Sequence, residues 1–139
     1  MPQLSKKFLS AQQLVSDNVA DAIAWVRKHG IHDDVAGSIE IVLAEALNNI
    51  VEHAYLYRAG EQIEMDLILG ADALEITLTD QGEKFPGIPQ KREMKGDAIR
   101  FEDLPEGGFG WFLIHSLTQS IRYAFVDGKN VVRFEIDCA

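Results

Sequence analysis

Residues 62–80 read Gln62-Ile-Glu-Met-Asp-Leu-Ile-Leu-Gly-Ala-Asp-Ala-Leu-Glu-Ile-Thr-Leu-Thr-Asp80. Apolar residues alternate with mostly polar ones from Ile63 to Leu69 and again from Leu74 to Leu78, and a Gly-Ala-Asp sequence separates the two runs. Because successive side chains of a strand point to opposite faces, this stretch predicts two antiparallel strands. Each strand would have one face on the core and one toward solvent.

A second hairpin is predicted at the C-terminal end. Asp127-Gly128 is a strong two-residue turn signal, and every second residue on both sides of it is apolar. Two more strands therefore close the chain. Their alternating apolar positions are Ile121, Tyr123 and Phe125 before the turn and Val132, Phe134 and Ile136 after it.

The residues before the first hairpin repeat with the period of a helix. Ser10 and Gln13 have the spacing of a capping box, which predicts a first helix over residues 10–30. Acidic residues favour the start of a second helix at Asp33, and its apolar stripe continues to about Arg58, which makes it the longest element. The stripes are Val15, Val19, Ala22, Ile23 and Val26 in the first helix and Ile39, Val42, Leu43, Ala46, Ile50 and Ala54 in the second.

The composition is that of one soluble globular domain. Hydrophobic residues make up 47% and charged residues 25% of the 139 residues, which are average values for such domains. We therefore expect a single domain over residues 1–139. Strands with one apolar face need a layer of helices over that face, so the predicted fold class is an α+β two-layer sandwich.

Charge, cysteine content and hydropathy exclude several classes of protein. The 22 acidic and 13 basic residues give a net charge of -9, which would repel a phosphate backbone and disfavours direct nucleic-acid binding. Cys138 is the single cysteine, so an intramolecular disulfide and a Cys-based metal site are excluded. No apolar run approaches the roughly 20 residues of a bilayer span. We expect a cytoplasmic protein with no membrane partner.

Glu45, Asn49 and His53 are spaced four apart on the second predicted helix. Each step turns only about 40° around the helix axis, so the three side chains would form one polar row beside the apolar stripe. A carboxylate can take a hydroxyl proton, and an Asn amide oxygen is a suitable ligand for Mg²⁺. The alternative is an ordinary solvated helix edge.

Two predicted turns contain residue types that can bind a ligand. Asp80-Gln-Gly82 offers a carboxylate that can accept a hydrogen bond from adenine N6, and a glycine that lets a ring approach the backbone. Gly107-Gly-Phe-Gly110 precedes an apolar helical segment whose unpaired N–H groups would bind phosphate. Either turn can also be ordinary turn chemistry. Between them, the Pro- and Gly-rich residues 81–110 predict a functional lid or, alternatively, a solvated connection.

The order and spacing of these signals are more specific than each signal alone. The stretches are Glu45-Ala-Leu-Asn-Asn49-Ile-Val-Glu-His53-Ala-Tyr55, then Asp80-Gln-Gly-Glu-Lys-Phe85, then Gly107-Gly-Phe-Gly-Trp-Phe-Leu-Ile114. Together they resemble the three boxes of the GHKL ATPase superfamily. The form of the first box and the short lid resemble the bacterial anti-sigma factor serine/threonine kinases. Lys84 departs from the pattern, because many members have a glycine there.

The resemblance implies a Bergerat-type two-layer α/β sandwich with a mixed, mostly antiparallel sheet, helices on one face, and an ATP lid over about residues 81–107. It implies that Glu45 is the catalytic general base, that Asn49 binds Mg²⁺ and that Asp80 contacts adenine. Gly108 and Gly110 would be hinges of the lid near the phosphates. The implied ATP-binding residues are Asn49, His53, Asp80, Gly82, Phe85, Gly107, Gly108, Phe109 and Gly110.

The function implied is that of an anti-sigma regulatory serine/threonine protein kinase. Such a kinase binds ATP and Mg²⁺, phosphorylates an anti-sigma factor antagonist protein and sequesters a sigma factor, and a homodimer would fit this family. The alternative is a non-catalytic switch that holds a partner protein in response to ATP or ADP, although Glu45 favours the enzyme. A histidine kinase catalytic domain ranks below both, because the chain begins at once with a strand and a helix.

Overall fold

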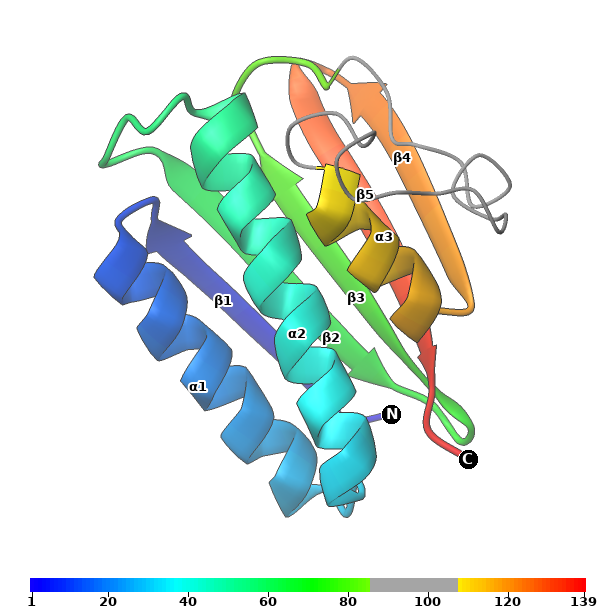
Figure 1. Ribbon diagram of the computed structural model, residues 1–139. Helices are drawn as coiled ribbons and strands as arrows, with labels where there is room; N and C mark the ends of the chain where they lie inside the picture. The colour runs from blue at the N-terminus through cyan, green and yellow to red at the C-terminus, as the bar shows by residue number, and fades with distance from the viewer. Residues whose placement is uncertain (86–107) are drawn as a thin grey trace.

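The computed structural model describes residues 1–85 and 108–139. The elements in chain order are β1 (Gln3–Leu9), α1 (Gln12–Lys28), α2 (Asp33–Asn49), η1 (Ile50–Ala54), β2 (Gln62–Leu69), β3 (Ala73–Asp80), α3 (Gly108–Leu117), β4 (Ser120–Val126) and β5 (Lys129–Asp137). Figure 1 shows the helices on one face of a five-stranded sheet, which confirms the predicted α+β two-layer sandwich. Of the expected lid, residues 86–107 lie outside the described residues.

The sheet has the strand order β1-β2-β3-β5-β4, and each of its four strand pairs is antiparallel. The resemblance implied a mixed sheet, whereas the strands described here are antiparallel throughout. Both predicted hairpins form. In the second, Asp127 and Gly128 have φ angles of 54° and 76°, the left-handed pair that a type I′ turn needs. The β3–β5 register places Asp80 opposite Asn130.

Ser10 does not cap α1, so the predicted capping box is wrong. The N-cap residue is Ala11, and it makes no side-chain capping hydrogen bond. Instead, the Ser10 hydroxyl donates to the carbonyl oxygen of Arg58 (2.7 Å) and accepts from the N–H of Glu61 (3.1 Å). Ser10 is buried at the end of β1, and the loop that leads into β2 supplies both partners. These long-range contacts outweigh the local capping preference.

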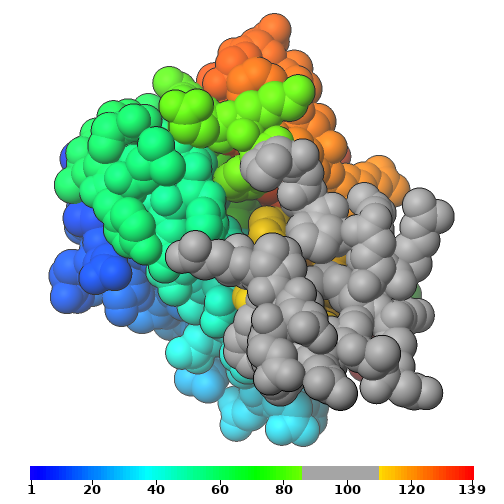
Figure 2. All heavy atoms as spheres, turned by 45° about the horizontal axis from the view of Figure 1, so that its top comes forward, coloured from blue at the N-terminus to red at the C-terminus, as the bar shows by residue number. Residues whose placement is uncertain are grey.

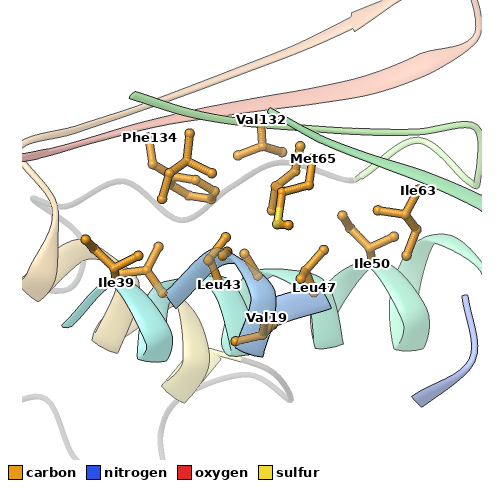
Figure 3. Close-up of a cluster of buried hydrophobic side chains, with 14 of the residues drawn as sticks. Val19, Ile39, Leu43, Leu47, Ile50, Ile63, Met65, Val132 and Phe134 are labelled. Carbon is orange, nitrogen blue, oxygen red and sulfur yellow. The ribbon is translucent and has the colours of Figure 1, made fainter. Parts of the chain in front are cut away.

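The core lies between the sheet and the three helices, and α2 runs through its centre. Ile39, Leu43, Leu47 and Ile50 are at most 1% exposed. Figure 3 shows them pointing at Met65, Val132, Phe134 and other side chains of the sheet. Each fully buried side chain of this kind stabilises the fold by about 1.5–3 kcal/mol. The predicted stripes of the two helices and of β3 and β5 are buried, which confirms most of the predicted core. Leu47 was not predicted, and Phe125, which was predicted in β4, is 41% exposed.

The α-helical part of α2 ends at Asn49, earlier than the sequence predicts. One π-helical turn, η1, follows, in which the N–H of Tyr55 donates to the carbonyl oxygen of Ile50 (2.9 Å). Leu56 and Tyr57 then have positive φ angles of 50° and 64°, which no helix can continue. The π turn therefore ends the helix before Arg58, and it is a feature that often marks functional sites.

None of the helices in the described ranges has the length and hydrophobicity needed to cross a bilayer.

Candidate functional site

The predicted site residues gather at one end of the sandwich. Several element ends meet at the top of the molecule in Figure 1. They are the C-terminal end of α2 with η1, the start of α3, the end of β3 and the start of β5. Figure 2 looks onto this end and shows part of α3 (yellow) below the turn after β3 (lime green) and to the right of the green atoms that include η1. Three stretches that are far apart in the sequence thus meet in one place.

Glu45, Asn49 and Gly110 are in direct proximity. Glu45 and Asn49 lie one turn apart on α2, where Glu45 is half-buried and Asn49 is 6% exposed. A Cβ atom at Gly110 would lie 2.8 Å from Oε2 of Glu45 and 3.8 Å from Nδ2 of Asn49. The glycine therefore lets the first turn of α3 approach the two polar side chains, which a larger residue would displace.

Two buried side-chain atoms have no hydrogen-bond partner in the described parts of the chain, and both belong to predicted site residues. They are Nδ2 of Asn49 and Oδ2 of Asp80. An unpaired buried polar atom is destabilising by about 1–3 kcal/mol, so folded proteins rarely retain one without a reason. Finding one at each of two predicted contacts, and on two different elements, is the strongest structural sign of a ligand site.

Asp80 ends β3 and is 1% exposed. Its Oδ1 accepts hydrogen bonds from the N–H of Gly82 (2.9 Å) and from Nδ2 of Asn130 (2.8 Å). Burial raises the pKa of the carboxyl above its ordinary value, and the hydrogen bonds from Asn130 and Gly82 offset part of this effect. The side chain is thus held through one oxygen, while the other oxygen remains available as an acceptor.

Gly82 has a structural role in addition to the one expected from the sequence. A Cβ atom at this position would lie 2.4 Å from the carbonyl oxygen of Ala54. The next residue, Glu83, donates its N–H to that same oxygen (2.8 Å). The turn after β3 is therefore docked against the end of η1, and only glycine allows the two backbones this close.

His53 is the exposed member of the polar row that the sequence predicts. Its side chain is exposed, and its Nε2 lies 3.7 Å from Oε2 of Glu52. Glu45 and Asn49 remain on the side facing Gly110, whereas His53 lies near the surface.

Phe85 is buried beside the turn. Its ring centroid lies 5.4 Å from that of Tyr123 and 6.5 Å from that of Trp111, in an edge-on arrangement with the latter. Gly108 opens α3 and Phe109 is in its first turn. Gly107 lies outside the described residues.

Sequence reasoning missed Asn130, Tyr123 and Tyr55. The Tyr123 hydroxyl donates to Oδ1 of Asn130 (2.6 Å). The Tyr55 hydroxyl donates to the carbonyl oxygen of Gln62 and accepts from the N–H of Gln81 (2.8 Å), which ties η1 to β2 and to the turn after β3. Burial raises the pKa of both phenols. A signal for Asn130 was present, since it is polar at the position that strand alternation assigns to the core.

The site has polar groups that could bind a nucleotide, but its described residues do not form a complete set of metal ligands. The residues described contain no group of three His, Cys, Asp or Glu side chains placed to hold a metal ion. A Mg²⁺ ion would therefore rely on Asn49 and on oxygens of the bound phosphates, as is common for this ion. The two unpaired atoms fit such a ligand: one donor where phosphates would lie and one acceptor where a base would lie.

This chain belongs to the histidine kinase-like ATPase domain family, whose model matches residues 10–136. The GHKL resemblance of the three boxes is thereby confirmed. Serine-protein kinase RsbW of Halalkalibacterium halodurans is 33% identical over 118 residues, which cover 83% of this chain and 67% of the relative. Serine-protein kinase RsbW of Bacillus cereus is 36% identical over 103 residues, which cover 73% and 63%. The chain thus spans about two thirds of the length of these relatives.

A solved structure of the RsbU and RsbW domains of Rv1364c from Mycobacterium tuberculosis has the same fold. It superposes with a TM-score of 0.69 at 14% sequence identity and covers 98% of this chain and 32% of the larger one. At this identity the likeness concerns the fold alone. It agrees with the two-layer sandwich described above.

Proposed function

We propose that this chain is an ATP-dependent serine/threonine protein kinase of the anti-sigma factor type. The observation that carries the proposal is the pair of buried atoms, Asn49 Nδ2 and Asp80 Oδ2, that have no partner among the described residues, together with the close approach of Gly110 to Glu45 and Asn49. The names of the relatives, which are serine-protein kinases, support the same activity.

Asp80 is the adenine contact in this proposal. Its free Oδ2 would accept a hydrogen bond from the exocyclic N6 amine, which no guanine or hypoxanthine base has at that place. Because the carboxylate is buried and held by Gly82 and Asn130, it would meet the base without rearrangement.

The phosphates would lie at the start of α3. The first N–H groups of a helix have no partner within the helix, and they carry the positive end of the helix dipole. Gly108 and Gly110 leave this end open to an anion. Nδ2 of Asn49 would donate to a phosphate oxygen, while its amide oxygen would ligate Mg²⁺. The ion would neutralise charge on the transferred group.

Glu45 is the general base in this proposal. Its carboxylate lies one helical turn from Asn49 and against the start of α3, which is where a transferred phosphoryl group would be held. It would accept the proton of a serine or threonine hydroxyl as that oxygen attacks, and the surrounding residues would position the two reactants.

The acceptor would be an anti-sigma factor antagonist protein, and the kinase would also sequester a sigma factor. A homodimer fits this mode of action. Because the reaction needs ATP, we place the protein in the cytoplasm.

The test combines the purified chain with radiolabelled ATP, Mg²⁺ and the antagonist protein encoded nearest to it. Label on a serine or threonine of the antagonist, lost with Glu45→Ala, is the expected result. Binding of ATP without any transfer would instead favour the non-catalytic switch. No binding of ATP or ADP at millimolar concentration would overturn the nucleotide site itself.

A further inference from the structure

Asn130 connects the candidate base contact to three other parts of the site. Its Nδ2 donates to Oδ1 of Asp80 (2.8 Å) and to the carbonyl oxygen of Glu83 (2.8 Å). Its Oδ1 accepts from the Tyr123 hydroxyl (2.6 Å) and from the N–H of Phe85 (3.3 Å). The residue is 0% exposed, so one amide uses both of its donors and its acceptor oxygen inside the protein.

This amide determines which oxygen of Asp80 is free. A carboxylate has two equivalent oxygens and can turn about its last side-chain bond. With Asn130 and Gly82 both donating to Oδ1, that oxygen has two donors, and Oδ2 has no partner among residues 1–85 and 108–139. Without the Asn130 donor, a single N–H from Gly82 would hold the group, and either oxygen could take that bond.

We propose that Asn130 is a positioning residue for adenine selectivity: it fixes the Asp80 carboxylate so that one oxygen always faces the base. This assignment rests on the proposed function, because it assumes that Asp80 contacts adenine. Asn130 acts through Asp80 and needs no contact of its own with the nucleotide.

The assignment predicts a loss of discrimination rather than a uniform loss of affinity. ADP has an N6 amine that donates to the fixed oxygen, whereas IDP has a carbonyl oxygen at that place, which a carboxylate repels. We expect the wild-type chain to bind ADP at least about tenfold more tightly than IDP, the difference that one charge-assisted hydrogen bond supplies. A carboxylate that can turn would lose most of this preference.

The test is calorimetric titration of the full chain with ADP and with IDP. Asn130→Leu keeps the approximate shape and removes the donors, so the ADP preference should fall to about threefold or less, mainly through weaker ADP binding. Asn48→Leu is the matched control. It makes the same substitution at an exposed amide on α2, and it should change both affinities by the same small factor.

Asn130→Asp keeps the test informative if the leucine variant does not fold. The carboxyl introduced at position 130 would lie against Oδ1 of Asp80, and two carboxyls this close share one proton at low pH. That proton can replace the amide donor, so the ADP preference should be retained at low pH and should fall as the pH rises and the pair loses the shared proton. The wild-type chain is titrated over the same pH range as the reference.

The outcomes separate the two proposals. A folded Asn130→Leu or Asn130→Asp protein that keeps the wild-type ADP preference at every pH overturns the assignment of Asn130 alone. An equal loss of ADP and IDP affinity also overturns it, because that pattern is the one expected of a purely structural residue. A wild-type chain that binds neither nucleotide, or both equally, overturns the proposed base contact and this assignment with it.

Discussion

Gly110 packs against the carboxylate of Glu45, so that a Cβ atom at position 110 would lie 2.8 Å from Glu45 Oε2. The two residues are 65 positions apart and come from different helices, α2 and α3. Such a contact explains why the third box needs glycine at this position. Any side chain there would push away the carboxylate that we assign as the general base.

Gly110→Ala should reduce phosphoryl transfer without unfolding the chain. The methyl group meets the far end of a flexible side chain, so Glu45 can turn aside at little cost to stability. A displaced base is expected to slow transfer by roughly 10²-fold, the effect of about 1 Å of misplacement. Single-turnover transfer beside thermal unfolding checks this.

The matched control for this substitution is Gly37→Ala, also on a helix. A Cβ atom at Gly37 meets nothing within 4 Å, so alanine should stabilise α2 by up to about 1 kcal/mol and leave transfer unchanged. If both alanine variants transferred at the wild-type rate, the contact between Gly110 and Glu45 would have no part in catalysis.

Glu45→Ala should separate binding from chemistry. The base is needed only when the acceptor hydroxyl loses its proton, so nucleotide affinity should survive while transfer falls by roughly 10²- to 10⁴-fold. Nucleotide titration and single-turnover transfer measure the two effects. Glu40→Ala, an exposed carboxylate on the same helix, serves as the control. Transfer by Glu45→Ala at the wild-type rate would refute the assignment of the base.

Asn49→Ala should weaken both Mg²⁺-dependent binding and transfer. The metal neutralises charge in the bound nucleotide as well as in the transition state, so loss of its ligand affects both steps. Its neighbour Asn48 is exposed and faces away from the site, and Asn48→Ala should change neither. Titrations with and without Mg²⁺ decide the matter. A variant whose binding remains as sensitive to Mg²⁺ as the wild type would exclude Asn49 as the ligand.

Asp80→Asn should stabilise the chain without nucleotide at neutral pH while removing its preference for adenine. The folded pKa of Asp80 is raised by burial, so the protonated form is favoured in the folded state. Because the folded state binds this proton more tightly than the unfolded state, Asp80 contributes most to stability below the unfolded pKa of 3.8. This contribution is lost as the pH rises through the folded pKa of Asp80. The variant should therefore have a higher unfolding midpoint than the wild type at pH 7, and the difference should shrink toward pH 4.

The measurement for Asp80→Asn is thermal unfolding in a series of buffers from pH 4 to pH 8 without nucleotide. A lower midpoint than the wild type at pH 7 would contradict the prediction. It would mean that the hydrogen bonds to the charged carboxylate outweigh the cost of its burial.

Gly82→Ala should destabilise the fold more than Gly110→Ala. Its Cβ atom would meet the backbone oxygen of Ala54 at 2.4 Å, and backbone cannot turn aside as a side chain can. The turn after β3 must move, and overpacking of this kind typically costs about 1–3 kcal/mol. Chemical denaturation of the two alanine variants side by side tests the order. Equal stability of both would show that the turn has room to shift.

The periodicity of the sequence was sufficient to predict most of the elements and the core. Ile63 to Leu69 and Leu74 to Leu78 alternate and form β2 and β3, and Asp127-Gly128 forms the predicted turn. These features follow from neighbours along the chain, because the period of the apolar residues selects strand or helix and the turn residues permit the needed φ angles. Ser10 shows the limit of prediction from local patterns. Its hydroxyl has hydrogen-bond partners at positions 58 and 61, which no pattern of neighbouring residues reveals.

The sequence by itself predicted the fold class and the family, and it singled out Glu45, Asn49, Asp80 and Gly110 as candidate site residues. Only the tertiary structure decided which partners and how much burial each of those residues has. The register of β3 against β5 puts Asn130 on Asp80 across 50 positions, and the α-helical part of α2 ends at Asn49, where a π turn follows. The physical reason is that spacing predicts which way a side chain faces along its own element, whereas partners, burial and unpaired atoms depend on what other elements bring to the same place.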